Sequence, residues 1–117
     1  MKRYHVYGMG AALVDTELKV TDNDLTTMVV DKGMMTLVDE AKQAEILTYL
    51  QHHQIQASRA SGGSAGNTII ASSYFGGKCF FSGKVADDEN GHFYMQDMHA
   101  AGVDTPSAKL EPGITGK

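Results

Sequence analysis

One stretch of the chain, residues 55–83, constrains the fold more than any other. A β-prone run over 55–61 leads into a glycine-rich turn over 62–67, and a helical pattern over 68–75 follows. A glycine pair then closes that helix, and the apolar run 79–83 predicts a buried strand. A strand, a helix and a second strand in this order are typical of two parallel strands joined by a crossover helix.

The same alternation of β-prone and helical segments continues on both sides of this stretch. A strand is predicted over 4–8, and helices are predicted to begin at Asp39 and near Asp87, because acidic residues favour a helix N-terminus. The short polar pieces of Leu18–Asp31 predict a β-hairpin with Asp22-Asn23-Asp24 as its turn. The predicted fold class is therefore α/β, a Rossmann-like, mostly parallel sheet with flanking helices.

Size and composition exclude several classes of protein. The 117 residues allow one domain, and 42% hydrophobic residues are enough for a core. A net charge of -4, with the Lys and Arg residues scattered, argues against nucleic acid as a partner. No apolar run reaches the roughly 18 residues of a membrane span, and the run after Met1-Lys2-Arg3 is too short for a signal peptide. With Cys79 as the single cysteine, we expect a cytoplasmic protein that has neither a disulfide nor a membrane partner.

Three familiar ligand motifs are incomplete in this sequence. Gly8-Met9-Gly10 follows a predicted strand, but Leu13 occupies the position of the third glycine in a dinucleotide-binding fingerprint. No phosphate loop of the form GxxxxGKS or GxxxxGKT occurs in the chain. His92 and His99 lie seven residues apart without a third ligand at a suitable spacing, so no metal site is predicted.

Two segments are candidates for ligand binding, and each also has a purely structural interpretation. Asp15 lies just beyond the first predicted strand, at the sheet edge where α/β proteins bind ligands, and its carboxylate could accept two hydrogen bonds from a vicinal diol. It could equally be a surface carboxylate at a turn. Gly62 and Gly63 permit close ligand approach, and Asn67 offers a donor and an acceptor. These three residues could equally form a tight turn, with Asn67 as the N-cap of the next helix.

The region 61–105 combines several of these features into a longer pattern. It contains a GGxxxN turn, a glycine pair, a G-x-V-x-x-D-x-x-G string at Gly83, Val85, Asp88 and Gly91, and the sequence AAGVDT. In these motifs the chain resembles the PfkB/ribokinase family of carbohydrate and nucleoside kinases. The segments GMGAALVDTELKV and KGMMTLVDEA are similar to the adenosine-kinase-like branch, except that Ala11 stands where that branch usually has asparagine.

The resemblance covers essentially the whole chain, and it implies a fold and a site. Residues 1–117 would be the truncated N-terminal part of a ribokinase-like kinase domain, with segments of about 16–35 and 107–117 forming the start of a β-lid. Asp15 and Asn67 match the family residues that hold sugar hydroxyls. Gly62 and Gly63 match a di-glycine hinge. No catalytic residue is expected within this chain, because the family's catalytic aspartate would lie beyond Lys117.

The resemblance also implies an activity. It predicts the substrate-binding and lid portion of a kinase that transfers phosphoryl from ATP, with Mg²⁺, to a primary hydroxyl of a small-molecule sugar or nucleoside. This portion alone is expected to be inactive. As for protein partners, the resemblance leaves open a homodimer. The competing hypothesis is a non-catalytic truncated module that binds a ligand or a partner.

Overall fold

A computed structural model describes residues 3–117. Met1 and Lys2, on which the prediction about a signal peptide partly depends, lie outside the described residues. The chain divides into two compact units, which are described separately below. The first consists of residues 1–16 and 59–117, and the second consists of residues 17–58.

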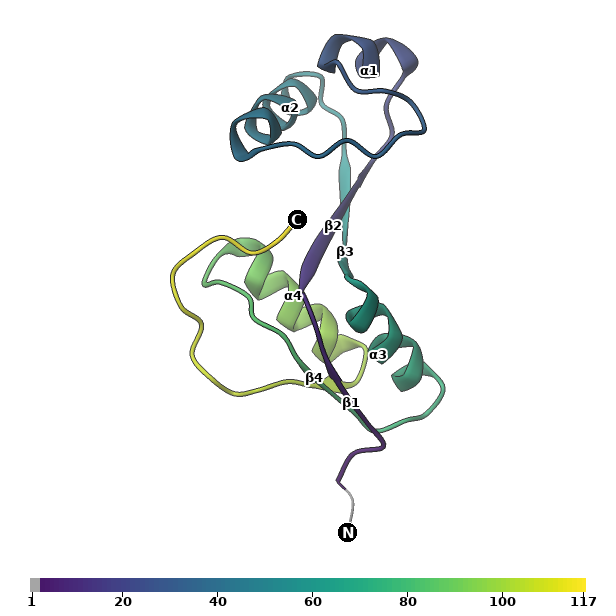
Figure 1. The fold of residues 1–117 in the computed structure, drawn as a ribbon, viewed down its shortest axis with the longest axis vertical. Helices are drawn as coiled ribbons and strands as arrows, with labels where there is room; N and C mark the ends of the chain where they lie inside the picture. Colours follow the sequence, from purple (N-terminus) through teal and green to yellow (C-terminus); the bar gives the residue numbers. More distant parts are fainter. Residues whose placement is uncertain (1–2) are drawn as a thin grey trace. The chain divides into compact units, whose positions relative to one another are not determined.

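A three-stranded parallel sheet forms the centre of the first unit (Figure 1). Its strand order is β1 (Val6–Met9), β4 (Cys79–Ser82) and β5 (Val103–Asp104). The helix α4 (Glu89–Ala100) connects β4 to β5, whereas α3 (Ser64–Tyr74) leads into β4 from β3 (Ala57–Gly62), which belongs to a separate sheet. The strands predicted at 55–61 and 79–83 are therefore not neighbours in one parallel sheet. This arrangement confirms the predicted α/β class with parallel strands and flanking helices. The strands pair in the register Val6 with Cys79 and Phe80 with Asp104.

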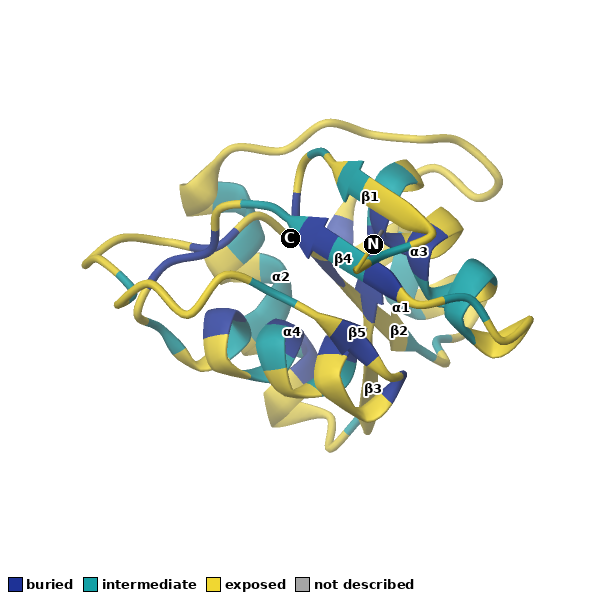
Figure 2. Cartoon of the chain, turned by 90° about the horizontal axis from the view of Figure 1, so that it is seen from below, coloured by how far each residue is buried: buried dark blue, intermediate teal, exposed yellow. Residues whose placement is uncertain are grey.

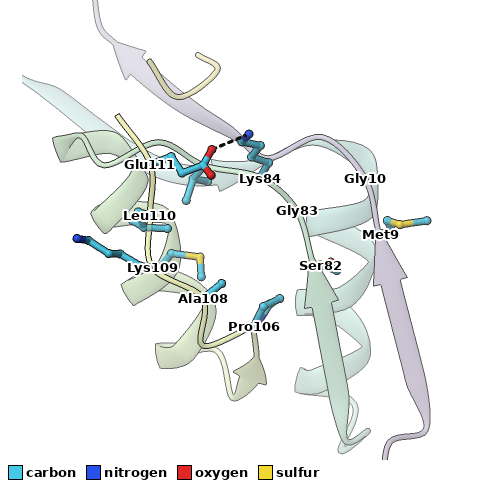
Figure 3. A pocket seen from close by; sticks show the side chains of 12 residues that line it. Met9, Gly10, Ser82, Gly83, Lys84, Pro106, Ala108, Lys109, Leu110 and Glu111 are labelled. Atoms are coloured by element: carbon cyan, nitrogen blue, oxygen red, sulfur yellow. Dashed lines mark hydrogen bonds and ion pairs between the residues drawn. The ribbon is translucent and has the colours of Figure 1, made fainter. Parts of the chain in front are cut away.

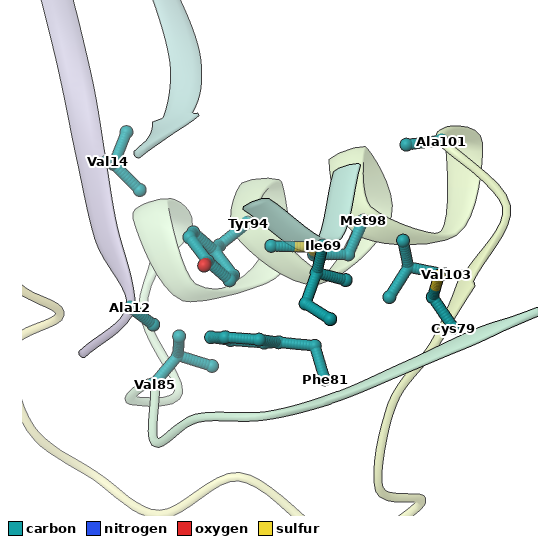
Figure 4. Close-up of a cluster of buried hydrophobic side chains, with 10 residues drawn as sticks. All are labelled: Ala12, Val14, Ile69, Cys79, Phe81, Val85, Tyr94, Met98, Ala101 and Val103. Carbon is teal, nitrogen blue, oxygen red and sulfur yellow. The ribbon is translucent and has the colours of Figure 1, made fainter. Parts of the chain in front are cut away.

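The two faces of this sheet differ because side chains alternate along each strand. Figure 2 shows buried segments, in dark blue, along β4, β5 and α4. Phe81 faces the helices and packs on the fully buried Tyr94 of α4, with their ring centroids 5.9 Å apart (Figure 4). Phe80 is on the opposite face, between Tyr4 and Tyr7, with ring centroids 5.2 Å apart in each pair. The hydrophobic core therefore lies on the helix-covered face, and it consists of Ala12, Val14, Ile69, Cys79, Phe81, Val85, Tyr94, Met98, Ala101 and Val103.

Close helix packing on this face depends on small residues. A Cβ atom at Gly8 would lie 2.7 Å from Cδ1 of Ile69, and one at Gly10 would lie 2.6 Å from Cβ of Ala65. Gly8 lies in β1 and Gly10 lies just after it, and both contacts are with α3, so glycine at these two positions lets the helix approach the strand closely. Burial and the nearby Asp97 raise the pKa of Tyr94 to about 12, so this tyrosine stays neutral in the core.

A second, two-stranded sheet joins β2 (Leu13–Leu18) to β3 (Ala57–Gly62) (Figure 1). The chain leaves the first unit along β2 and returns along β3. The second unit contains α1 (Asp22–Met28) and α2 (Glu40–His52). The hydroxyl of Tyr49 on α2 donates a 2.8 Å hydrogen bond to Asp24 on α1, and this bond ties the two helices together.

The predicted β-hairpin over Leu18–Asp31 is wrong, because the helix α1 occupies the middle of that segment. The physical reason is a capping box: Asp24 N–H donates to Thr21 Oγ1 at 3.2 Å, and Thr21 N–H donates to Asp24 Oδ2 at 2.8 Å. The Asp22-Asn23-Asp24 run is therefore the first turn of a helix and not the turn of a hairpin. In the segment of about 16–35 that was predicted to start a β-lid, β2 ends at Leu18 and α1 follows over Asp22–Met28.

Candidate functional site

Asp15 and Gly62 meet at the pair of strands β2 and β3. A Cβ atom at Gly62 would lie 2.6 Å from Cγ and 2.7 Å from Oδ1 of Asp15, so the carboxylate lies directly against the glycine backbone. Gly62 is buried, whereas Asp15 is exposed. Among residues 3–117 the Asp15 carboxylate has no hydrogen-bond or ion-pair partner in the protein. The structure thus places an open anionic acceptor beside a backbone that carries no side chain.

Gly63 follows directly and is the N-cap of α3. Its φ of 87° and ψ of 143° belong to a region that only glycine occupies readily. A Cβ atom here would lie 2.5 Å from the carbonyl oxygen of Ala11, so a side chain is excluded on two grounds. As glycine offers no capping side chain, the first amides of α3 receive no side-chain cap.

Asn67 lies inside α3 and is not its N-cap, because the helix begins at Ser64. Its backbone N–H donates to Gly63 O at 2.9 Å. Its side chain is exposed and lines a cavity of about 360 Å³ together with Ala60, Ser61, Ile70, Ala71, Tyr74, Asp97 and Ala101. The structure therefore brings Asp15, Gly62 and Gly63 together, while the Asn67 side chain belongs to a neighbouring cavity.

Ser61 and Asp97 are polar residues of that cavity which sequence reasoning missed. The backbone N–H of Ser61 donates to Asp97 Oδ2 at 3.1 Å. The hydroxyl of Ser61 is buried, and within the described residues it has no hydrogen-bond partner. The two residues are 36 positions apart, so no local pattern indicated that they would meet.

A larger cavity of about 490 Å³ lies at the carboxyl ends of β1 and β4 (Figure 3). Ligands of parallel α/β sheets bind at this edge. An ion pair of 3.2 Å between the exposed Lys84 and Glu111 crosses its rim. The predicted substrate residues are not among those lining it, which are Met9, Gly10, Ser82, Gly83, Lys84, Val85, Met95, Pro106, Ala108, Lys109, Leu110 and Glu111.

Asp88 connects the start of α4 to the last residues of the chain. Its carboxylate accepts from Gly91 N–H at 2.7 Å, from the Thr115 hydroxyl at 2.6 Å and from Thr115 N–H at 2.8 Å. The two bonds from Thr115 are the main cause that lowers the pKa of Asp88 below its ordinary value. The hydroxyl of the buried Thr115 also accepts from Ala86 N–H at 3.0 Å. The segment around Thr115 is thereby fixed to the loop between β4 and α4.

Neither a metal centre nor a membrane span emerges from the part of the chain that the structure describes. Residues 3–117 contain no group of three or more His, Cys, Asp or Glu side chains arranged to hold a metal ion. The helices in the same range are too short or too polar to cross a bilayer.

A family model described as pfkB family carbohydrate kinase matches residues 25–116. The chain belongs to this family. The resemblance seen in the GGxxxN turn and the G-x-V-x-x-D-x-x-G string is therefore confirmed. The pfkB family includes proteins much longer than this chain, as the following comparisons show.

Solved structures of two sugar or nucleoside kinases resemble the chain along nearly its whole length. A probable sugar kinase from Rhizobium etli CFN 42 is 34% identical with a TM-score of 0.71, covering 95% of this chain and 32% of that one. The adenosine kinase from Sinorhizobium meliloti is 35% identical with a TM-score of 0.71, covering 94% of this chain and 32% of that one. The ribokinase-like fold is thereby confirmed, and the chain spans about a third of these relatives.

Among curated proteins, a 5-dehydro-2-deoxygluconokinase from Halalkalibacterium halodurans is 48% identical over 54 residues. This match covers 46% of the chain and 16% of the relative. The relatives of this pfkB-family chain therefore include kinases named for an acidic sugar and for a nucleoside.

Proposed function

We propose that this chain is the substrate-binding and lid portion of an ATP-dependent kinase that phosphorylates a primary hydroxyl of a sugar or nucleoside. The observation that carries this proposal is the exposed Asp15 carboxylate beside Gly62, which has no partner among the described residues. An ionised carboxylate can accept hydrogen bonds from two neighbouring hydroxyl groups, and such charge-assisted bonds are roughly twice as strong as neutral ones. The family relationship supports a sugar or nucleoside substrate as the molecule that carries those hydroxyls.

The other predicted residues have complementary roles in this proposal. Gly62 and Gly63 carry no side chain, which lets the Asp15 carboxylate lie against the backbone at Gly62 and the Ala11 carbonyl lie against it at Gly63. Asn67, one turn into α3, adds an amide that can donate and accept. Positioning of this kind is a large part of catalysis in phosphoryl transfer. That the segments 16–35 and 107–117 belong to a lid excluding water stays a prediction.

ATP and Mg²⁺ belong to the proposal only through the complete enzyme. Residues 3–117 include no cluster of His, Cys, Asp or Glu side chains arranged to hold a metal ion, and the sequence has no GxxxxGKS or GxxxxGKT loop. We therefore derive no step through ATP or Mg²⁺ from this chain, and we expect the chain alone to form no ADP.

The decisive experiment uses the full natural protein that carries this sequence. Binding of adenosine, ribose and 5-dehydro-2-deoxygluconate is measured by calorimetry, and ADP formation is followed with ATP and Mg²⁺. Asp15→Asn should weaken binding of the preferred substrate roughly 10- to 100-fold, because hydroxyls lose a charged acceptor. Glu40→Gln, at an exposed acidic position on α2, is the matched control and should bind like the unmodified protein.

Three results would contradict parts of this proposal. An unchanged KM and kcat/KM in Asp15→Asn would remove Asp15 from the site. Ligand binding without ADP formation by the full protein would favour the alternative of a non-catalytic binding module. ADP formation by residues 1–117 alone would show that the chain contains a catalytic base.

A further inference from the structure

The Asp88 carboxylate has two roles, because it caps α4 and also binds the Thr115 segment. Oδ1 accepts from Gly91 N–H at 2.7 Å, which caps α4, and it also accepts from the Thr115 hydroxyl at 2.6 Å. Oδ2 accepts from Thr115 N–H at 2.8 Å. One oxygen is sufficient for a helix cap, as Asp39 shows at the start of α2, where a single bond of 2.8 Å from Lys42 N–H is made. The second oxygen of Asp88 therefore serves the Thr115 segment.

The Thr115 segment in turn supports the strand that carries Asp15. The carbonyl oxygen of Gly116 accepts from Val14 N–H at 2.9 Å, and Leu13 and Gly116 form an isolated parallel bridge. Thr115 is 2% exposed and Val14 is 1% exposed, so both ends of this connection are buried. Within the described residues, β2 pairs with β3 and, at its start, with Gly116.

We propose that Asp88 is a positioning residue for the Asp15 site: through Thr115 and Gly116 it fixes the β2 backbone on which the Asp15 carboxylate is mounted. This inference rests on the proposed function for its consequence on substrate binding. Its structural part does not, because the chain of hydrogen bonds from Asp88 to Val14 exists independently of any ligand. Asp88 lies 73 positions from Asp15 and acts on it only through this chain.

Asp88→Asn separates the two purposes of the carboxylate. Asparagine is as good an N-cap as aspartate, and its amide oxygen can still accept from Gly91 N–H. Its NH₂ group cannot accept from Thr115 N–H, so that bond is lost, while the remaining oxygen can still cap the helix and accept from the Thr115 hydroxyl. Asp39→Asn is the matched control, because it makes the same substitution at a cap that supports no second segment.

The first measurement is hydrogen exchange by mass spectrometry in the full natural protein, in peptides covering β2 and α4. Asp88→Asn should raise the exchange rate of the β2 peptide about tenfold and leave that of α4 unchanged, while Asp39→Asn should change neither. Thr115→Val removes the hydroxyl at similar shape and should raise β2 exchange in the same way. Thr115→Ser keeps the hydroxyl and should behave like the unmodified protein. Unchanged β2 exchange in both Asp88→Asn and Thr115→Val would overturn the proposal.

The second measurement is substrate kinetics. Asp88→Asn should raise KM about fivefold or more and change kcat less than twofold, since Asp15 holds the substrate and takes no part in the bond change. Faster β2 exchange with an unchanged KM would overturn the positioning role. If the unmodified protein binds no sugar or nucleoside, the proposed function fails, and β2 exchange alone then decides whether Asp88 fixes this strand.

Discussion

At the scale of single residues, steric contact explains the glycine pair of the candidate site. A Cβ atom at Gly62 would occupy the space of the Asp15 carboxylate, and one at Gly63 would meet the Ala11 carbonyl. Both steric conflicts would arise in the folded structure as it stands, with no movement of the chain. The pair is therefore required for the site to form, whether or not it also serves as the hinge that the family resemblance implies.

Alanine substitutions at Gly63 and Gly76 test this explanation. Both glycines have a positive φ, of 87° and 91°, but nothing lies within 4 Å of a Cβ atom at Gly76. Gly76→Ala should cost about 1 kcal/mol of unfolding free energy from its backbone conformation alone. Gly63→Ala should cost roughly 2–5 kcal/mol, because the contact with Ala11 is added to the strain. Urea unfolding followed by circular dichroism measures both, and equal losses would show that the contact with Ala11 relaxes without cost.

At the scale of secondary-structure elements, the sequence predicted those segments that have both periodicity and a clear boundary signal. Asp39 caps α2, and Gly76 follows α3 with a positive φ, as the local patterns indicate. The segment 18–31 has two competing signals, and the capping box of Thr21 and Asp24 prevailed over the turn propensity of the Asp-Asn-Asp run. A threonine three residues before an acidic side chain was the signal that could have identified α1.

Thr21→Ala measures how much α1 depends on this cap. Loss of the Thr21 side chain should destabilise the helix by about 1 kcal/mol, because Asp24 N–H loses its acceptor. Thr26→Ala is the control on the same helix: its hydroxyl bonds only to the Asp22 carbonyl, and the change should stay within about 0.5 kcal/mol. Hydrogen exchange of a peptide spanning α1 reports both values. Similar effects of the two substitutions would show that the cap contributes nothing specific.

The site could be predicted from the sequence only in part, because it depends on contacts between elements that are far apart in the chain. Asp15 and Gly62 were identified as separate candidates, but their contact depends on how β2 pairs with β3, which neither segment encodes alone. Asn67 was predicted at a helix start, and the structure places it one turn inside α3 because Gly63 is the cap. The sequence string containing Asp88 and Gly91 was recognised by resemblance, and its connection to Thr115 appeared only with the fold.

At the scale of the whole molecule, each of the two units contains a carboxylate whose pKa the fold lowers. The bonds from Thr115 lower the pKa of Asp88 in the first unit, and those from Thr21 lower the pKa of Asp24 in the second. A carboxyl group with a lower pKa in the folded than in the unfolded state binds fewer protons when folded. It therefore contributes stability above its unfolded pKa, near 3.8, and this stability is lost as the pH falls through the folded pKa.

The contribution of these two groups to the free energy of unfolding should consequently be constant from pH 7 to about 5 and should decline below pH 4. Asp88→Asn removes one titrating group, so its stability should be lower than that of the unmodified protein at pH 7 and should fall less steeply below pH 4. Asp24→Asn should act in the same way on α1 and α2, since Asp24 accepts from Thr21 and Tyr49. Hydrogen exchange at matched chemical exchange rates, recorded at several pH values between 3 and 7, resolves the two units separately. If either substitution leaves the pH dependence of its own unit's stability unchanged, the fold does not lower the pKa of that carboxyl group. The bonds that Thr115 or Thr21 donates to it then contribute no pH-dependent stability.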